Sequence, residues 1–105
     1  MPKVRINAAA ALELQEAALW YEQEAPGTGE RLIDEFEAAI AILRDSPIPL
    51  VVVPGGPGKL GAKRLVLNRF PFDIVIIDHE DDELVVIAVA HQARSPGYWA
   101  GRRGT

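Results

Sequence analysis

The chain has 105 residues, of which 49% are hydrophobic and 25% charged, with no cysteine and a formal net charge of −4 at pH 7. This length and composition predict one globular domain with one core and exclude a disordered chain. Without cysteine there are no disulfides or thiolate metal sites, and no apolar run approaches the ~18 residues that cross a bilayer. Because the N-terminus also lacks a signal-peptide pattern, we expect a cytoplasmic protein.

The N-terminal part predicts a short strand and a pair of helices. Lys3–Ile6 alternates charged and apolar residues, as an edge strand does. Asn7 suits an N-cap, and Ala8–Glu24 consists largely of good helix formers. Pro26-Gly27 ends this helix, and a second helix is expected at Thr28–Asp45. The short linker makes the two an antiparallel helical hairpin.

Each helix is expected to bury one stripe of side chains. In the first helix the stripe is Ala11, Leu14, Ala18 and Tyr21. The acidic and amide residues beside it are expected to face water: Glu13, Glu16, Gln23 and Glu24. In the second helix the stripe is Leu32, Phe36, Ala39 and Leu43, widened by Ile33 and Ile40.

Residues 47–61 are rich in proline and glycine and predict a loop, with a brief extended piece at Leu50–Val53. The segment GGPGKLG at 55–61 is not a phosphate-binding loop, because its lysine precedes no Ser or Thr and no strand–loop–helix context surrounds it.

Three apolar runs after this loop predict three strands: Leu65–Leu67, Phe72–Ile77 and Leu84–Ala90. The Phe70-Pro71 step separates the first two, and the acidic run Glu80–Glu83 is a solvated turn between the last two. The predicted order is therefore β-α-α-β-β-β, a single α+β domain over residues 1–105. A helical hairpin packs on one face of a small antiparallel sheet.

If the acidic turn centres near Asp81-Asp82, His79 lies opposite Leu84 and His91 lies opposite Phe72. The two histidines are then ~23 Å apart and cannot share a metal. The face expected under the helices carries Phe72, Ile74, Ile76, Val85, Ile87, Val89 and His91. The opposite face carries Asp73, Val75, Ile77, Val86, Ala88, Ala90 and Gln92. If the preceding hairpin pairs Val66 with Asp73, Arg64 and Val66 join this face.

This opposite face is partly apolar and has no second layer of the chain to cover it. It is either a partner-binding surface or a surface covered by the proline-rich loop. At its end, His91 favours a hydrogen-bonded structural role over catalysis, and Arg94 fits an anion contact and a surface charge equally well. Tyr98 and Trp99 favour packing of the C-terminal segment onto the sheet. No Ser/His/Asp or Cys/His arrangement is present.

The order of these elements resembles the RelE/ParE superfamily, the toxins of type II toxin–antitoxin (plasmid stabilisation) systems, and the ParE-like branch most. The resemblance spans nearly the whole chain, and it rests on the order and spacing of several short motifs. These are Trp20-Tyr21-Glu22, Pro26-Gly27, Phe36, Arg64, Arg69-Phe70-Pro71-Phe72, Ala88-Val89-Ala90-His91, Arg94, Pro96, Tyr98-Trp99 and Arg102.

The resemblance implies a cytoplasmic bacterial toxin without cofactor or metal, neutralised by a cognate antitoxin that wraps an extended or helical segment over it. ParE-like members arrest growth by binding DNA gyrase, whereas RelE-like members cleave messenger RNA on the ribosome. A third alternative is a non-toxic homologue that only binds antitoxin.

Against the RelE pattern, Val66 replaces a lysine, and Asp73 and Gln92 each replace an arginine, which favours a toxin that is not an enzyme. Catalytic candidates are Arg64, His91, Arg94 and Tyr98. Candidates for binding the target or the antitoxin are Arg64, Val66, Asp73, Val75, Gln92 and Arg94.

Overall fold

The computed structural model describes residues 3–45, 51–52, 62–79, 83–94, 97–99 and 101–102. The acidic turn at 80–82, Pro96 and most of the proline-rich loop lie outside this range. The elements are β1 (Lys3–Ile6), α1 (Ala8–Glu24), α2 (Thr28–Asp45), β2 (Val51–Val52), β3 (Lys63–Val66), β4 (Phe72–His79) and β5 (Glu83–His91). The predicted order is confirmed, and β2 occupies the expected extended piece.

The strands form one sheet in the order β1-β5-β4-β3-β2. The pairs β2–β3, β3–β4 and β4–β5 are antiparallel, but β1 pairs in parallel with β5. The expectation of a purely antiparallel sheet is therefore wrong, although β1 does lie at an edge. No short turn joins β1 to β5, so the local pattern of β1 could not reveal its partner or direction.

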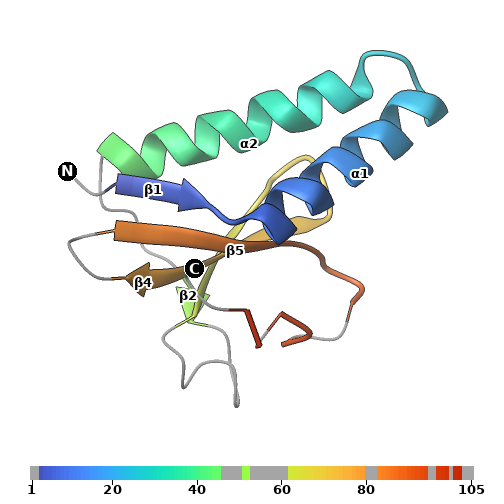
Figure 1. Cartoon of the computed structure of the whole chain (residues 1–105). Coiled ribbons are helices and arrows are strands. Elements are labelled where there is room, and N and C mark those ends of the chain that lie inside the picture. Colours follow the sequence, from blue (N-terminus) through green and yellow to red (C-terminus); the bar gives the residue numbers. More distant parts are fainter. Residues whose placement is uncertain are drawn as a thin grey trace.

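The two helices lie side by side on one face of the sheet (Figure 1). Asn7 caps α1, because its side-chain oxygen accepts a hydrogen bond from the Ala10 N–H at 2.9 Å. At the other end, Gly27 adopts a φ of +92° that favours glycine, and the carboxylate of Glu22 accepts hydrogen bonds from the N–H groups of Gly27 and Gly29. A Cβ on Gly29 would collide with the carbonyl oxygen of Ala18, so this glycine permits the close approach of the helices.

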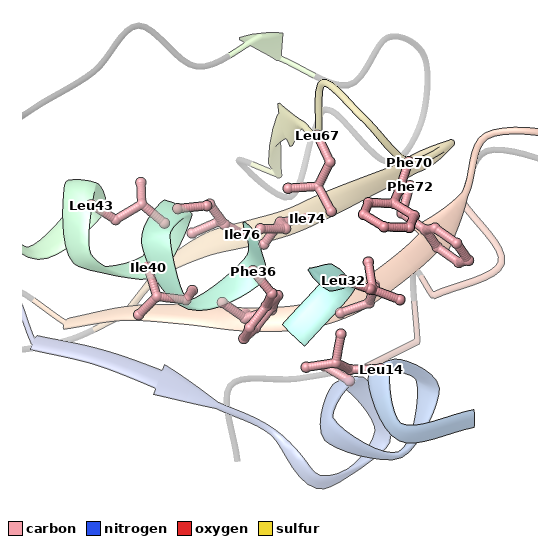
Figure 2. Packing of buried hydrophobic residues seen from close by; sticks show 14 residues of the cluster. Leu14, Leu32, Phe36, Ile40, Leu43, Leu67, Phe70, Phe72, Ile74 and Ile76 are labelled. Atoms are coloured by element: carbon pink, nitrogen blue, oxygen red, sulfur yellow. The ribbon is translucent and has the colours of Figure 1, made fainter. Parts of the chain in front are cut away.

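The larger core, the helix-side core, lies between the helices and the sheet (Figure 2). The α2 stripe is buried as predicted, except that Ile33 is partly buried. In α1 the buried residues are Ala10 and Leu14, whereas the predicted Ala11, Ala18 and Tyr21 are partly buried. The buried side chains are Ala10, Leu14, Leu32, Phe36, Ala39, Ile40, Leu43, Leu67, Phe70, Phe72, Ile74, Ile76, Val86 and Val89. Neither helix combines the length and hydropathy needed to cross a membrane within the described residues.

A β-bulge in β5 changes the predicted register. Phe72 lies opposite His91 as expected and Val75 opposite Ala88, but Ile76 lies opposite Val86, which leaves Ile87 as the extra residue. Beyond the bulge His79 pairs with Glu83, so the expected pairing with Leu84 is wrong. The extra residue reverses the alternation of side chains along the rest of the strand.

The bulge therefore moves three residues to the face opposite the predicted one. Val86 joins the helix-side core, while Val85 and Ile87 join a second cluster on the other face of the sheet. This second cluster, the outer-face cluster, consists of Ala62, Val75, Val85, Ile87, Ala88, Ala90 and Trp99.

The outer-face cluster also corrects the expectation of an uncovered apolar strip. Trp99 is only 2% exposed and packs over this face, and Ala62 is fully buried. Val75, offered as a surface residue, is buried beneath them. Of the residues proposed for that face, Val66, at 44% exposure, and the polar Gln92 are exposed. The packing role expected of Tyr98 and Trp99 is confirmed.

Candidate functional site

A cavity of about 330 Å³ opens on the outer face of the sheet. It lies between β3, the paired ends of β4 and β5 near Phe72 and His91, and the C-terminal segment, by which we mean the described residues after β5. All of the catalytic and binding candidates line it, because the meander brings the start of β4 and the end of β5 beside β3. The lining residues are Arg64, Val66, Asp73, Val75, Ala90, His91, Gln92, Arg94, Tyr98 and Trp99.

Asp73 is one of the residues that line the cavity. Its carboxylate is largely buried and accepts hydrogen bonds from Nη1 of Arg64 at 3.4 Å and from Nε2 of Gln92 at 3.1 Å. Burial of a carboxylate is costly without such partners, so Arg64 and Gln92 hold it in place. The Nε of Arg64 is also buried, and it has no partner among the described residues. The cavity wall therefore carries a negative group, which repels a phosphate.

A second polar group forms behind the cavity around Glu13 of α1. The Tyr98 hydroxyl donates to Oε2 of Glu13 at 2.6 Å, and Nη1 of Arg102 donates to Oε1 of Glu13 at 2.8 Å. The same Nη1 donates to the carbonyl of Ile87 at 3.0 Å, while the N–H of Val89 donates to Oε1 of Glu13 at 3.1 Å. We call Glu13, Tyr98 and Arg102 the Glu13 cluster.

The expectation that Glu13 faces water is wrong, and the reason lies in the sheet. β1 pairs with β5 only as far as Val86, so the next backbone groups of β5 on that side lack a strand partner. Buried backbone N–H and C=O groups need partners, and Glu13 and Arg102 supply them. Helical periodicity could not show this, because the partners of Glu13 lie 76 and 89 residues away in the sequence.

Tyr98 is held in its neutral form. Burial, followed by the hydrogen bond to Glu13, raises the pKa of Tyr98 to about 12. The guanidinium of Arg94 lies 3.6 Å from the ring centroid, and its Nη1 is 3.7 Å from Oε2 of Glu13. With its proton committed to Glu13, Tyr98 is a poor general base near neutral pH.

His91 makes a local hydrogen bond and an aromatic contact. Its Nδ1 accepts a hydrogen bond from the N–H of Ala93 at 3.0 Å, and its ring meets Phe72 edge-on with centroids 5.1 Å apart.

No group of three His, Asp or Glu side chains that could hold a metal occurs within the described part of the chain. Charges of both signs surround the cavity, which suits a mixed polar surface better than a polyanion.

No protein-family model matches the chain, and no curated protein matches it. Among solved structures, a chain of the chromosomal ParDE TA system from P. aeruginosa has the same fold, with a TM-score of 0.66. The match covers 87% of this chain and 96% of that chain, at 16% sequence identity. It confirms the two-helix α+β fold that the sequence predicts and that the family resemblance implied.

Proposed function

We propose that the chain is the toxin of a type II toxin–antitoxin system, of the ParE-like kind, and that a cognate antitoxin neutralises it in the bacterial cytoplasm. The observation that carries the proposal is the shared fold with a chain of a ParDE toxin–antitoxin system over most of both chains. The order of short motifs from Trp20 to Arg102 supports it independently, because that order was identified from the sequence alone.

The cavity supports an action by binding rather than by RNA cleavage. Cleavage needs groups that stabilise a negative transition state and move protons. Here Val66 offers neither, Asp73 adds a negative charge, and the Tyr98 hydroxyl is engaged as a hydrogen-bond donor to Glu13. We therefore propose that the chain arrests growth by binding a cellular target, with DNA gyrase as the target that the ParE resemblance implies.

One observation favours the alternative of a ribosome-dependent messenger RNA endoribonuclease. Arg64 and Arg94 both line the cavity beside Tyr98, and two guanidinium groups are suited to a phosphate. Asp73 already bonds Arg64, and Glu13 lies 3.7 Å from Arg94, so neither charge is free of a nearby carboxylate. We therefore keep the endoribonuclease and the non-toxic homologue as alternatives to the proposed function.

The first test is inducible expression in a bacterial host, alone and together with the neighbouring gene. We expect growth arrest, filamentation with abnormal nucleoids and intact messenger RNA, with growth restored by the neighbouring gene. Rapid loss of translated messages would instead support the endoribonuclease, and unimpeded growth at confirmed expression would support the non-toxic homologue.

A second test uses purified components. The chain should inhibit supercoiling by DNA gyrase and leave ribosome-bound messages uncut. The double variant Arg64→Ala and Arg94→Ala should lose inhibition if the cavity contacts the target, whereas Arg44→Ala, an exposed arginine on α2, is the matched control. Full inhibition by the double variant would place the contact elsewhere on the protein.

A further inference from the structure

Helix α1 is apolar on two sides. Ala10 and Leu14 face the helix-side core, yet Leu12, Leu19 and Trp20 on the other side are 55%, 60% and 55% exposed. Leu12 and Leu19 are seven residues apart, so both lie on the same side of the helix, with Trp20 beside them. We call Leu12, Glu16, Leu19 and Trp20 the outward face of α1.

A small aromatic cavity lies next to the outward face. Its volume is about 270 Å³, and it is lined by Ala17, Trp20, Tyr21, Phe72 and His91. The rings of Trp20 and Tyr21 meet edge-on with centroids 5.0 Å apart, which fixes one wall. A cavity of this size beside exposed leucines offers a place for one apolar side chain of a bound segment.

The charge around the outward face selects the kind of partner. The sequence of α1, AAAALELQEAALWYEQE, has four glutamates and no basic residue. Glu13 and Glu22 are occupied by the contacts described above, but Glu16 and Glu24 are exposed close to the apolar residues. Positive side chains would complement this rim, since opposite charges across an interface favour association and like charges oppose it.

The same charges argue against a second copy as the occupant. Glu16 stands midway along α1, between Leu12 and Leu19. A symmetric antiparallel pairing of two α1 helices would therefore bring Glu16 of one copy against Glu16 of the other, because a two-fold interface repeats the same patch on both sides.

We propose that the outward face of α1 docks a basic amphipathic helix of a partner protein. The apolar stripe of that helix packs on Leu12 and Leu19, one side chain enters the aromatic cavity at Trp20, and Lys or Arg residues lie near Glu16 and Glu24. This surface differs from the cavity that carries the proposed function, and the inference stands whether or not the chain is a toxin.

The probe is a synthetic Leu/Lys amphipathic helix of about 18 residues, roughly the length of α1, compared with a Leu/Glu peptide of the same pattern. Binding is followed by calorimetry and by the fluorescence of Trp20, whose emission should shift to the blue as it leaves water. Trp99 is already buried, and a Trp20→Phe variant checks the assignment of the signal. Salt of about 150 mM limits non-specific charge effects.

We expect the Leu/Lys peptide to bind at least about tenfold more tightly than the Leu/Glu peptide. The double variant Leu12→Ser and Leu19→Ser should weaken binding at least about tenfold, and Glu16→Lys about threefold or more. Ile42→Ser is the matched control, since Ile42 is 49% exposed on α2, and it should change nothing. Circular dichroism verifies that each variant is folded.

Three results would overturn the proposal. Equal affinity for the two peptides would show that the partner need not be basic. Unchanged binding by the folded double variant would show that the peptide binds somewhere other than the outward face of α1. A concentration-dependent dimer that the double variant abolishes would identify a second copy as the occupant. Because none of these readouts involves growth arrest or gyrase, failure here is distinguishable from failure of the proposed function.

Discussion

The two faces of the sheet are covered in different ways. On one face, α1 and α2 bury a continuous apolar core. On the other, a short C-terminal segment covers part of the strands through Trp99 and is held by the Glu13 cluster. The first face depends on non-directional burial and the second on a few directional bonds. The less completely covered face is the one that contains the cavity. The site therefore depends on fewer packing contacts than the helix-side core does.

The largest difference between the faces should appear when each loses one buried side chain. Ile76 lies in the helix-side core and is nearly inaccessible, so Ile76→Ala should lower the free energy of unfolding by about 2–5 kcal/mol. Urea unfolding measures this loss. The control is Val66→Ala, at an exposed site, expected within about 0.5 kcal/mol. A loss below about 1 kcal/mol for Ile76→Ala would show that the helix-side core is not the main source of stability.

The matching change on the other face is Trp99→Ala. Its cost should be about 2–3 kcal/mol, below the 3–5 kcal/mol usual for an enclosed tryptophan, because the C-terminal segment can detach instead of leaving a cavity. Hydrogen exchange should show faster exchange in β5 and unchanged protection in α2. If protection falls equally in both regions, the two faces form one cooperative unit and the comparison fails.

The variant Glu13→Gln tests the hydrogen bonds that Glu13 accepts from Tyr98 and Arg102. The amide keeps the shape of the side chain but loses the charge that accepts from Arg102 and Tyr98, so we expect a cost of about 1–3 kcal/mol in urea unfolding. Glu16→Gln, exposed on the same helix, should stay within about 0.5 kcal/mol. Similar values for both variants would mean that packing of Trp99 alone holds the C-terminal segment.

The smallest effect concerns pH. The pKa of Tyr98 is raised to about 12 by burial and by Glu13, against about 10 in an unfolded chain. The folded state therefore binds this proton more tightly, and stability should fall as pH rises from about 10 towards 12. The change is modest because solvent still reaches the ring. Ultraviolet titration of a Tyr21→Phe variant isolates Tyr98, and Glu13→Gln should lower its pKa. A titration near 10 in both backgrounds would contradict the geometry.

Local patterns were sufficient to predict most of the fold. The Asn7 cap, the Pro26-Gly27 stop and the apolar stripe of α2 each depend on neighbours in the sequence, and all three are present in the structure. The parallel β1–β5 pair was not predictable in this way, because its two strands lie at opposite ends of the chain. The bulge at Ile87 was also not predicted. In a strand that is apolar throughout, no polar residue shows where the alternation between the two faces of the sheet is interrupted.

The candidate site shows the same division. Alternation along the two strands beside the acidic turn was enough to place Asp73 and Gln92 on one face, and an assumed pairing of Val66 with Asp73 added Arg64 to it. Glu13 was missed because its partners, Val89 and Arg102, are separated from it by most of the chain. Long-range hydrogen bonds of this kind follow from which backbone groups the sheet leaves unpaired, and that is known only when the pairing of β1 is known.

The pairing of β1 with β5 has a consequence for synthesis of the protein on the ribosome. Arg5 and Glu83, which form an ion pair across these strands, are 78 positions apart in the sequence. At about 5–20 residues per second, β1 is synthesised ~4–16 s before its partner strand. During this interval the helical hairpin has no sheet to cover, so its apolar side is open to chaperones or to a partner protein. The cavity itself is complete only after Tyr98 and Trp99 have been added, so a nascent chain cannot act through this site before these two residues have been synthesised and folded onto the sheet.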